Sequence, residues 1–254
     1  MVEFVAAGTP LSRDDLNAAL DLIVVDEAAL WAVLTVETSG SGFLPDRRPK
    51  ILFERHYFHR LTNGAYDSDY PELSARKSGA YGAAGAHQYD RLETALSLDE
   101  SAALQSASWG LGQIMGTHFE KLEYSSPQDM IESFVQSEGD QLQGIAKFLI
   151  AEGLDKALRD KNWADLAKGY NGPNYAINQY DAKLASFYDR FSKGKLPDLS
   201  VRAAQLYLIY KGYSVTVDGV FGPSTSKALQ HFQTDNNLPA TGQLDEETLS
   251  ALAA

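Results

Sequence analysis

Residues 28–42 read Ala28-Ala29-Leu30-Trp31-Ala32-Val33-Leu34-Thr35-Val36-Glu37-Thr38-Ser39-Gly40-Ser41-Gly42. The apolar run predicts a buried helix that starts after Asp26 and ends near Glu37, and the small residues that follow predict a loop. Glu37 therefore lies where the core meets a cleft. Burial disfavours the charged form of a carboxyl and raises its pKa, which suits a general acid near neutral pH. The alternative is a plain helix-terminal charge, although an acid is electrostatically unfavourable at a helix C-terminus.

The composition is that of an acidic globular chain of 254 residues, with 44% hydrophobic and 22% charged residues. That length has room for one sizeable domain and a small one. The net charge of -12 argues against nucleic acid as a partner and against anionic membranes. A sugar held by neutral hydrogen bonds is compatible with this charge. The absence of cysteine excludes disulfides and thiol catalysis.

Helical patterns lie on both sides of the Glu37 segment. Ser12, followed by Arg13 and two acids, predicts a helix start. Lys50–Arg55 predicts a short strand or extended segment. Helical periodicity returns in four further ranges, 89–104, 128–151, 163–168 and 175–191. The N-terminal part is therefore expected to be mostly helical with a small extended element.

Residues 199–254 contain an internal repeat. Gly219-Val220-Phe221-Gly222 and Thr225 recur 23 residues later as Gly242-Gln243-Leu244-Asp245 and Thr248. Each unit combines a glycine turn, an apolar plug, a capping position and a helix, and a further helix near 201–211 completes a three-helix module.

The segment between the two parts contains glycine, proline and charges, from Phe191 to Asp198. This composition is typical of a linker. We therefore expect a first domain over 1–192, a linker over 193–199 and a second domain over 200–254.

The C-terminal repeat resembles the three-helix type of peptidoglycan-binding domain that is common on cell-wall hydrolases. The resemblance covers nearly all of residues 200–254 and rests on these segments: Asp218-Gly219-Val220-Phe221-Gly222, Ala228-Leu229, Phe232-Gln233, Leu238, Thr241-Gly242 and Leu244-Asp245. It implies that glycan strands of peptidoglycan are the partner. Tyr207, Tyr210 and Tyr213 are candidates for wall contact, with core packing or simple exposure as the alternative.

Three segments of the N-terminal part resemble goose-type lysozymes and lytic transglycosylases. Ser108–Met115 is similar to their Gly-Leu-Met-Gln-Ile segment, with Gly112 in place of the usual methionine. Ala167–Gly172 is similar to their Ala-Tyr-Asn-x-Gly segment. Glu37-Thr38-Ser39-Gly40 falls where those families carry Glu-Ser at the end of the first core helix.

The spacing between two of these segments differs from that of goose-type enzymes and points to a narrower family. Gln113 follows Glu37 by 76 positions, a longer gap than in typical goose-type enzymes. The inserted segment Arg48–His56, together with residues 37–43, closely resembles the phage-type N-acetylmuramidase family found in endolysins. This resemblance covers roughly residues 10–190.

The resemblance implies a mainly α fold: a lysozyme-like helical catalytic domain with a small extended or β element, and a small three-helix binding domain. It implies an endolysin that cleaves the β-1,4 bond between N-acetylmuramic acid and N-acetylglucosamine and causes lysis, with Glu37 as the general acid. The substrate-binding residues that it implies are Gln113, Tyr170, Asn171, Trp109 and Ser39. For Trp109, stacking on a sugar and a place in the core are alternatives.

Glu54 is the candidate for the second carboxylate that glycoside hydrolysis usually needs. In an extended segment Glu54 shares one face with Leu52 and His56. The alternative is an ion pair with Arg48 or Arg55. Asp46 and Asp90 are weaker candidates, and inversion and retention of stereochemistry are both open at this stage.

Other functions remain as alternatives. A lytic transglycosylase would use one glutamate and form anhydro-muramic acid ends. A wall-binding protein with an inactive hydrolase fold, or an effector delivered by a secretion machine, would carry the same motifs. His56 and His59 lie three residues apart without an acidic ligand pattern, so neither a metal site nor a cofactor is predicted.

The sequence also leads to expectations about location and assembly. No stretch reaches transmembrane length, and the first residues lack a basic region followed by an apolar one. We expect a monomer made in the host cytoplasm without a signal peptide, with no stable membrane insertion. It would reach the cell wall after release, through a holin pore.

Overall fold

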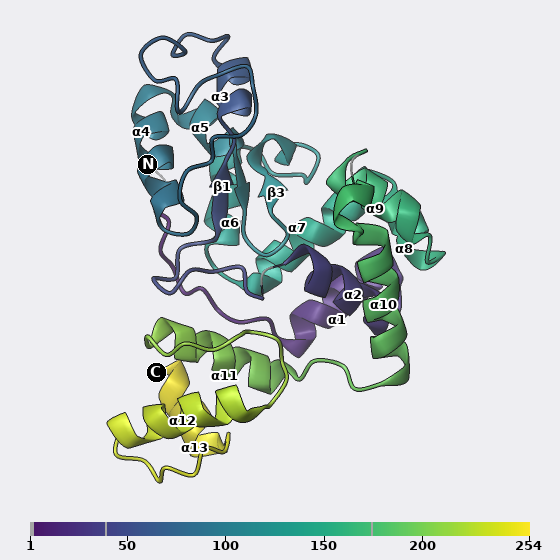
Figure 1. Ribbon diagram of the computed structural model, residues 1–254, viewed down its shortest axis with the longest axis vertical. Coiled ribbons are helices and arrows are strands. Elements are labelled where there is room, and N and C mark those ends of the chain that lie inside the picture. Colours follow the sequence, from purple (N-terminus) through teal and green to yellow (C-terminus); the bar gives the residue numbers. More distant parts are fainter. Residues whose placement is uncertain (1–2, 39, 174) are drawn as a thin grey trace.

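The computed structural model describes residues 3–38, 40–173 and 175–254. Figure 1 shows a large N-terminal part in which helices surround a small sheet, with a smaller helical module below it. The N-terminal part comprises α1 (Arg13–Ile23), α2 (Glu27–Glu37), β1 (Ile51–Phe53), α3 (Arg55–Leu61), α4 (His87–Leu98), α5 (Glu100–Gln105), β2 (Ala107–Trp109), β3 (Ile114–Met115), η1 (Gly116–His118), α6 (Pro127–Phe134), α7 (Glu138–Ala151), α8 (Leu154–Arg159), α9 (Trp163–Asn171), η2 (Tyr175–Asn178) and α10 (Tyr180–Lys193). The module comprises α11 (Leu199–Tyr210), α12 (Pro223–Asp235) and α13 (Glu246–Ala253). The predicted mainly α fold is confirmed.

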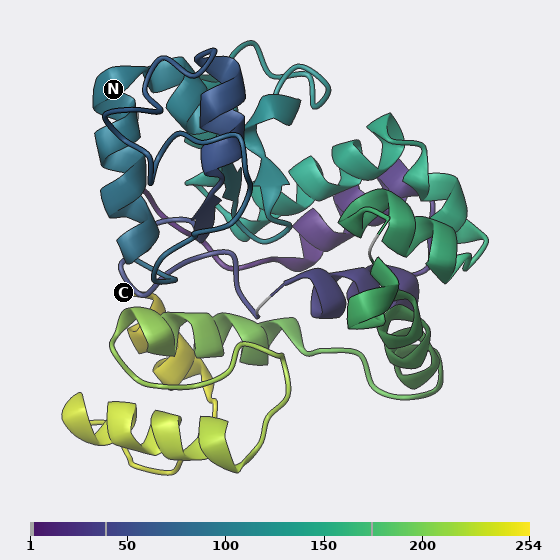
Figure 2. The same ribbon diagram turned by 45° about the horizontal axis from the view of Figure 1, so that its top comes forward.

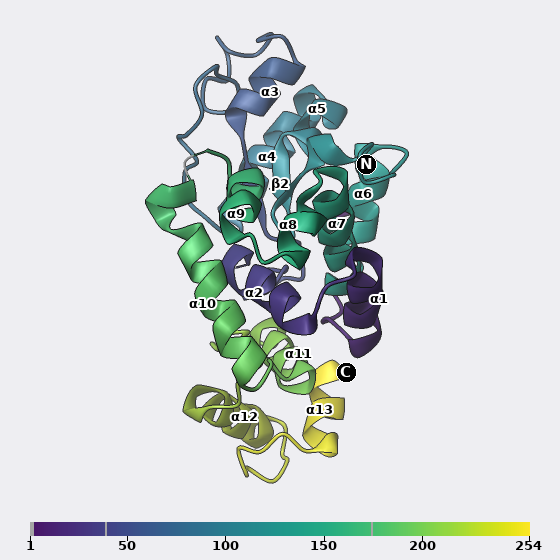
Figure 3. The same cartoon turned by 90° about the vertical axis from the view of Figure 1, so that its right-hand side faces the viewer.

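The first two helices begin where the sequence predicts. The Ser12 hydroxyl accepts from the backbone N–H of Asp15, whose carboxylate accepts in return from Ser12, so α1 starts with a capping box. The Asp26 carboxylate accepts from the Ala29 N–H at 2.9 Å and caps α2. α2 is buried over residues 29–34 and packs against α10, which runs beside it (Figure 3). Its last residue, Glu37, is thus held by a helix fixed in the core.

Two long predicted helices are each divided in the structure. The Asp99 carboxylate accepts from the Ala102 N–H at 2.9 Å, so a new helix, α5, starts inside the predicted range 89–104. The Ser137 hydroxyl accepts from the Asp140 N–H at 2.9 Å and starts α7 inside the range 128–151. In both places a side-chain cap ends the periodicity, because the cap competes with continuation of the helix.

The sheet is antiparallel, with strand order β1-β2-β3. Ile51 pairs with Trp109 across β1 and β2, and Trp109 pairs with Ile114 across β2 and β3. The predicted extended segment therefore ends at Phe53, and α3 begins two residues later. The expectation that Glu54 and His56 share one extended face is wrong, because the chain turns into a helix at that point. The buried Phe58 anchors this helix, and a run of seven residues was too short for its period to be read.

In the module the 23-residue repeat is visible as two similar turns. The Gln205 side chain accepts from the N–H groups of Asp218 and Gly219 at 2.9 and 2.8 Å. The Gln233 side chain accepts from the Gly242 N–H at 2.8 Å. Both amides also donate to the threonine at the start of the next helix. One buried glutamine therefore holds each glycine turn in the core of the module.

The module packs directly on the N-terminal part through α11 (Figure 2). Arg202 of α11 forms a salt bridge with Glu138 at the start of α7, and both side chains are buried. Phe43 packs with Leu206 and Val217 in an apolar cluster across the boundary. Tyr210, a candidate for wall contact with packing as the alternative, forms a contact between the two parts, because its hydroxyl donates to the Gly8 carbonyl at 2.7 Å. No helix within the described ranges is long and apolar enough to span a membrane.

Candidate active site

Glu37 is the last residue of α2 and is largely buried. Burial raises the pKa of its carboxyl from the ordinary 4.5 to about 7, against the opposing effects of a hydrogen bond from Asn171 and the charge of Lys183. The direction is the one predicted from the sequence, and its physical cause is desolvation of the carboxylate. A carboxyl with this pKa holds its proton over a wide range below neutral pH and can donate it to a leaving group.

Asn171 and Tyr170 connect Glu37 to the opposite side of the site. The Asn171 side-chain amide donates to Glu37 Oε1 at 2.9 Å. The neighbouring Tyr170 hydroxyl donates to the Gly112 carbonyl at 2.9 Å, in the turn between β2 and β3. Burial, together with the charge of Glu37, raises the pKa of Tyr170, so its hydroxyl stays protonated. The end of α9 therefore connects the acid to the turn, and the structure brings these two predicted residues together with Glu37.

Gln113 lies in the same turn and is held in an uncommon conformation. Its φ angle is 49°, in the left-handed region that non-glycine residues rarely adopt. The side chain accepts from the Ser108 hydroxyl at 2.9 Å and donates to the carbonyls of Gly110 and Lys50. The residue is nevertheless exposed. An exposed amide that is fixed by several contacts in a strained turn fits the predicted role in binding a sugar.

A buried glutamine, Gln141, packs against two loops of the site, the one that contains Gly42 and the turn that contains Gly110. The Gln141 side chain of α7 accepts from the Leu111 N–H at 2.7 Å and donates to the Phe134 carbonyl at 2.8 Å. A Cβ added at Gly42 or at Gly110 would collide with this side chain. Glycine is needed at both positions because the two backbones rest directly on the same amide.

Gly112 has no room for a side chain in this structure. A Cβ at this position would overlap the Ile145 side chain and approach the Tyr170 hydroxyl to 3.0 Å. We expect Gly112→Ala to destabilise the protein by about 1–3 kcal/mol, as overpacking does, and to displace Tyr170. Urea unfolding measures the loss, and cleavage assays measure the displacement. Unchanged stability would show that Ile145 can move aside.

Glu54 forms a second acidic position at the end of β1. Its Oε2 lies 3.2 Å from His56 Nδ1, but the two atoms are not aligned for a hydrogen bond and have no other hydrogen-bond partner among the described residues. Burial and the negative charge of Glu54 raise the pKa of Tyr81, which lies beside it. The alternative of an ion pair with Arg48 is not realised, because Arg48 pairs with Asp46 at 2.7 Å. Glu54 is half-buried, and its enclosed Oε2 lacks the hydrogen-bond partner that a buried polar atom normally has.

Trp109 is fully buried, donates to the Leu104 carbonyl at 3.0 Å and stacks on Phe4. The prediction that it binds substrate is therefore wrong, because its ring has no exposed face to offer a sugar. Ser39 lies outside the described residues. Within the described ranges, no group of three or more His, Asp or Glu side chains is placed to hold a metal ion.

Sequence reasoning missed two groups near the site. Lys183 of α10 acts electrostatically on Glu37 from a helix far along the chain. Glu138 accepts from the N–H of Gly42 at 2.9 Å and from Arg202, while Arg202 donates to the Gly40 carbonyl at 2.8 Å. The sequence around Gly40 and Gly42 gives no signal that a distant acid and arginine bind the backbone of this loop. Only the packing of α2, α7, α10 and α11 reveals them.

A carboxyl with a raised pKa at the end of a core helix, connected through Asn171 and Tyr170 to a glycine turn of a small antiparallel sheet, suits a lysozyme-type glycoside hydrolase. The model of the N-acetylmuramidase family matches residues 26–192, and that of the "Putative peptidoglycan binding domain" matches residues 198–252. The chain belongs to the N-acetylmuramidase family.

A solved structure agrees with this assignment. The chain is similar to the crystal structure of the Burkholderia AP3 phage endolysin, with 41% sequence identity and a TM-score of 0.68. The match covers 72% of this chain and 71% of that chain. None of the curated proteins matches the chain.

Proposed function

We propose that this protein is a phage endolysin that cleaves the β-1,4 bond between N-acetylmuramic acid and N-acetylglucosamine, with Glu37 as the general acid. The observation that carries the proposal is the pKa of Glu37, raised by burial to about 7 beside Asn171. The two matching family models supply the substrate class, peptidoglycan. The similarity to a phage endolysin supports the biological role.

In the proposed reaction the glycan strand lies over the turn of residues 110–113, with the scissile bond beside Glu37. The carboxyl donates its proton to the glycosidic oxygen as the bond from that oxygen to C1 of N-acetylmuramic acid breaks. N-acetylglucosamine leaves with a free 4-hydroxyl, and C1 acquires positive charge. Water then adds its oxygen to C1 and gives up a proton to a carboxylate, for which Glu54 is the proposed group. Asn171 and Gln113 orient the acid and the sugar.

Product analysis tests this function directly. Purified peptidoglycan digested by the protein is expected to yield muropeptides with reducing N-acetylmuramic acid ends, which mass spectrometry identifies. Anhydro-muramic acid ends would make the protein a lytic transglycosylase. Binding to the wall without any new ends would leave only the wall-binding function.

Glu54→Gln tests the second carboxylate. We expect the cleavage rate to fall by about a hundredfold, the lower end of the range for a general base, with a melting temperature close to that of the wild type. Glu93→Gln, an exposed acid on α4, serves as the matched control. A Glu54→Gln variant that cleaves at the wild-type rate would assign the whole reaction to Glu37.

The catalytic domain would span 1–192 and the wall-binding domain 200–254, joined by 193–199. The protein would act as a monomer on the cell wall after release from the host cytoplasm through a holin pore. The negative charge of -12 fits a substrate that is bound through hydrogen bonds.

A further inference from the structure

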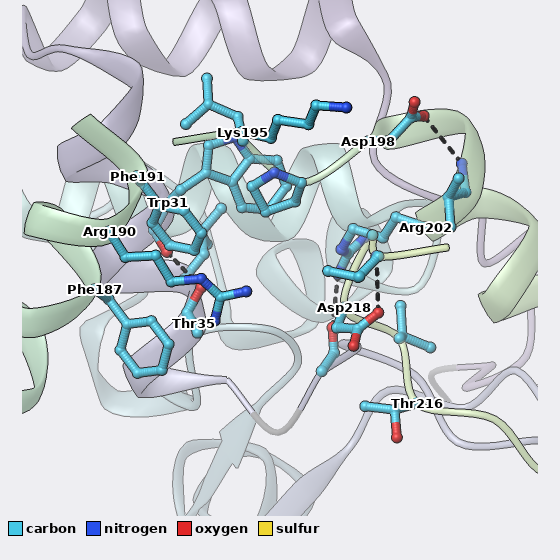
Figure 4. A pocket seen from close by; sticks show the side chains of 18 of the residues that line it. Trp31, Thr35, Phe187, Arg190, Phe191, Lys195, Asp198, Arg202, Thr216 and Asp218 are labelled. Atoms are coloured by element: carbon cyan, nitrogen blue, oxygen red, sulfur yellow. Dashed lines mark hydrogen bonds between the residues drawn. The ribbon is translucent and has the colours of Figure 1, made fainter. Parts of the chain in front are cut away.

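A cavity of about 740 Å³ lies where the binding module meets α2 and α10 (Figure 4). We propose that this cavity binds the peptide stem of the glycan strand that Glu37 cleaves, an inference that rests on the proposed function. The side chains that carry the argument come from both parts of the chain: Phe187, Arg190, Lys195, Asp198, Asp218 and Phe221.

The walls of the cavity are fixed relative to one another. Arg202, which lines the cavity, donates to the Gly40 carbonyl at 2.8 Å and pairs with the buried Glu138. Val217, another lining residue, is 4% exposed and belongs to the apolar cluster with Phe43. The cavity is therefore a built feature of two packed domains and not a gap between two tethered ones.

The charges in the cavity are of both signs and lie apart. Figure 4 shows Arg190 among the aromatic side chains of α10, with Asp218 across the cavity. Within the described residues, neither Arg190 nor Lys195 forms an ion pair. Asp198 and Asp218 each accept backbone N–H groups and keep further lone pairs. A short peptide with free carboxylates and one ammonium group matches this arrangement, and the stems of peptidoglycan have this chemistry.

The cavity also has an exposed apolar edge. Val220 is 49% and Phe221 40% exposed, although both are large hydrophobic residues of the first repeat unit. Phe187 of α10 also lines the cavity. These surfaces can cover the methyl groups of the alanine residues in a stem.

The distance from the reacting bond suits a stem. Lys183, whose charge acts on Glu37, and Arg190 lie on one face of α10, two helical turns or about 10 Å apart. An extended tetrapeptide spans up to about 14 Å. Thr38, the residue after Glu37, itself lines the cavity. A stem attached to the muramic acid at the cleavage point can therefore reach Arg190.

The first test compares two substrates, glycan strands with their stems and the same strands stripped of stems by an amidase. We expect the double variant Arg190→Gln/Lys195→Gln to lower the ratio of kcat/KM for stem-bearing over stem-free strands by about tenfold, mainly through KM, as loss of a charge-assisted contact does. The matched control is Lys193→Gln/Lys211→Gln, which removes the same charge outside the cavity and should keep the wild-type ratio. An unchanged ratio in the Arg190 and Lys195 variant, including equal losses on both substrates, would overturn the proposal.

The second test does not depend on cleavage. A free tetrapeptide of L-alanine, D-glutamate, meso-diaminopimelate and D-alanine is titrated into the isotope-labelled full-length protein and followed by NMR. We expect shifts of the backbone amides of Thr38, Gly40 and Gly194, and their loss in the double variant. Shifts without any glycan cleavage would refute the proposed function but support the cavity. Cleavage without shifts, or shifts caused only by a chitooligosaccharide, would overturn the cavity and leave the function intact.

Discussion

Replacing Glu37 with glutamine is expected to slow glycan cleavage about a thousandfold, within the range that a general acid contributes. Glutamine has no proton to give to the leaving oxygen. It keeps a side-chain oxygen that can accept the hydrogen bond from Asn171, so the site should retain its shape. The release of reducing ends from purified peptidoglycan below pH 7 measures the loss. A variant that folds and cleaves at the wild-type rate would remove Glu37 from the mechanism.

The same substitution should raise stability at high pH. The pKa of Glu37 is 4.5 in the unfolded chain and about 7 in the folded one, so its stabilising contribution is complete below pH 4.5 and is lost as pH rises through about 7. At about 1.4 kcal/mol per pKa unit, the loss above neutral pH is roughly 3 kcal/mol. Glutamine does not titrate. Urea unfolding should therefore show equal stability near pH 4 and a more stable variant near pH 8, and a difference independent of pH would contradict the raised pKa.

Replacing Arg202 with leucine is expected to lower the free energy of unfolding by about 3–5 kcal/mol, because it leaves a buried carboxylate without its partner. Glu138 is 0% and Arg202 4% exposed at the side chain. The change also removes the donor to the Gly40 carbonyl, in the loop that follows Glu37. We therefore expect a loss of activity together with the loss of stability. Chemical unfolding and the cleavage assay measure the two effects.

Two further variants check the explanation. Adding Glu138→Gln to Arg202→Leu removes the uncompensated charge. The N–H groups of Leu11 and Gly42 bond to different oxygens of Glu138, and glutamine keeps an oxygen for only one of them, so only part of the stability should return. Lys156→Met breaks an exposed pair with Asp160 and should change stability by no more than about 0.5 kcal/mol. Equal effects of Arg202→Leu and Lys156→Met would show that the buried pair adds nothing beyond an exposed one.

The sequence predicts the local features of this fold well. Ser12 and Asp26 predict the starts of their helices, because an N-cap is a contact between near neighbours in the chain. Glu37 could be singled out because its burial follows from the apolar run that precedes it. The 23-residue repeat was visible for the same reason, since each turn and its helix are consecutive.

What could not be predicted depends on contacts distant in sequence. Arg202 and Glu138 are 64 residues apart, and each looks like an ordinary helix charge until α11 packs on α7. Trp109 is buried in the core and stacks on Phe4, at the start of the N-terminal part. For Tyr210 the sequence leaves wall contact and packing as alternatives, and the contact of its hydroxyl with Gly8 decides for packing. Side-chain identity alone carries no information about such partners.

The buried pair between α7 and α11 restricts how freely these two domains can be exchanged during evolution or in protein engineering. If a wall-targeting module from another lysin lacked an arginine at the position of Arg202, Glu138 would be left buried without a partner for its charge. A catalytic domain transplanted without its module would meet the same defect. Chimaeras that fold well should therefore be those that inherit both residues or neither. The contact between the two domains thus limits which combinations of domains give a stable protein.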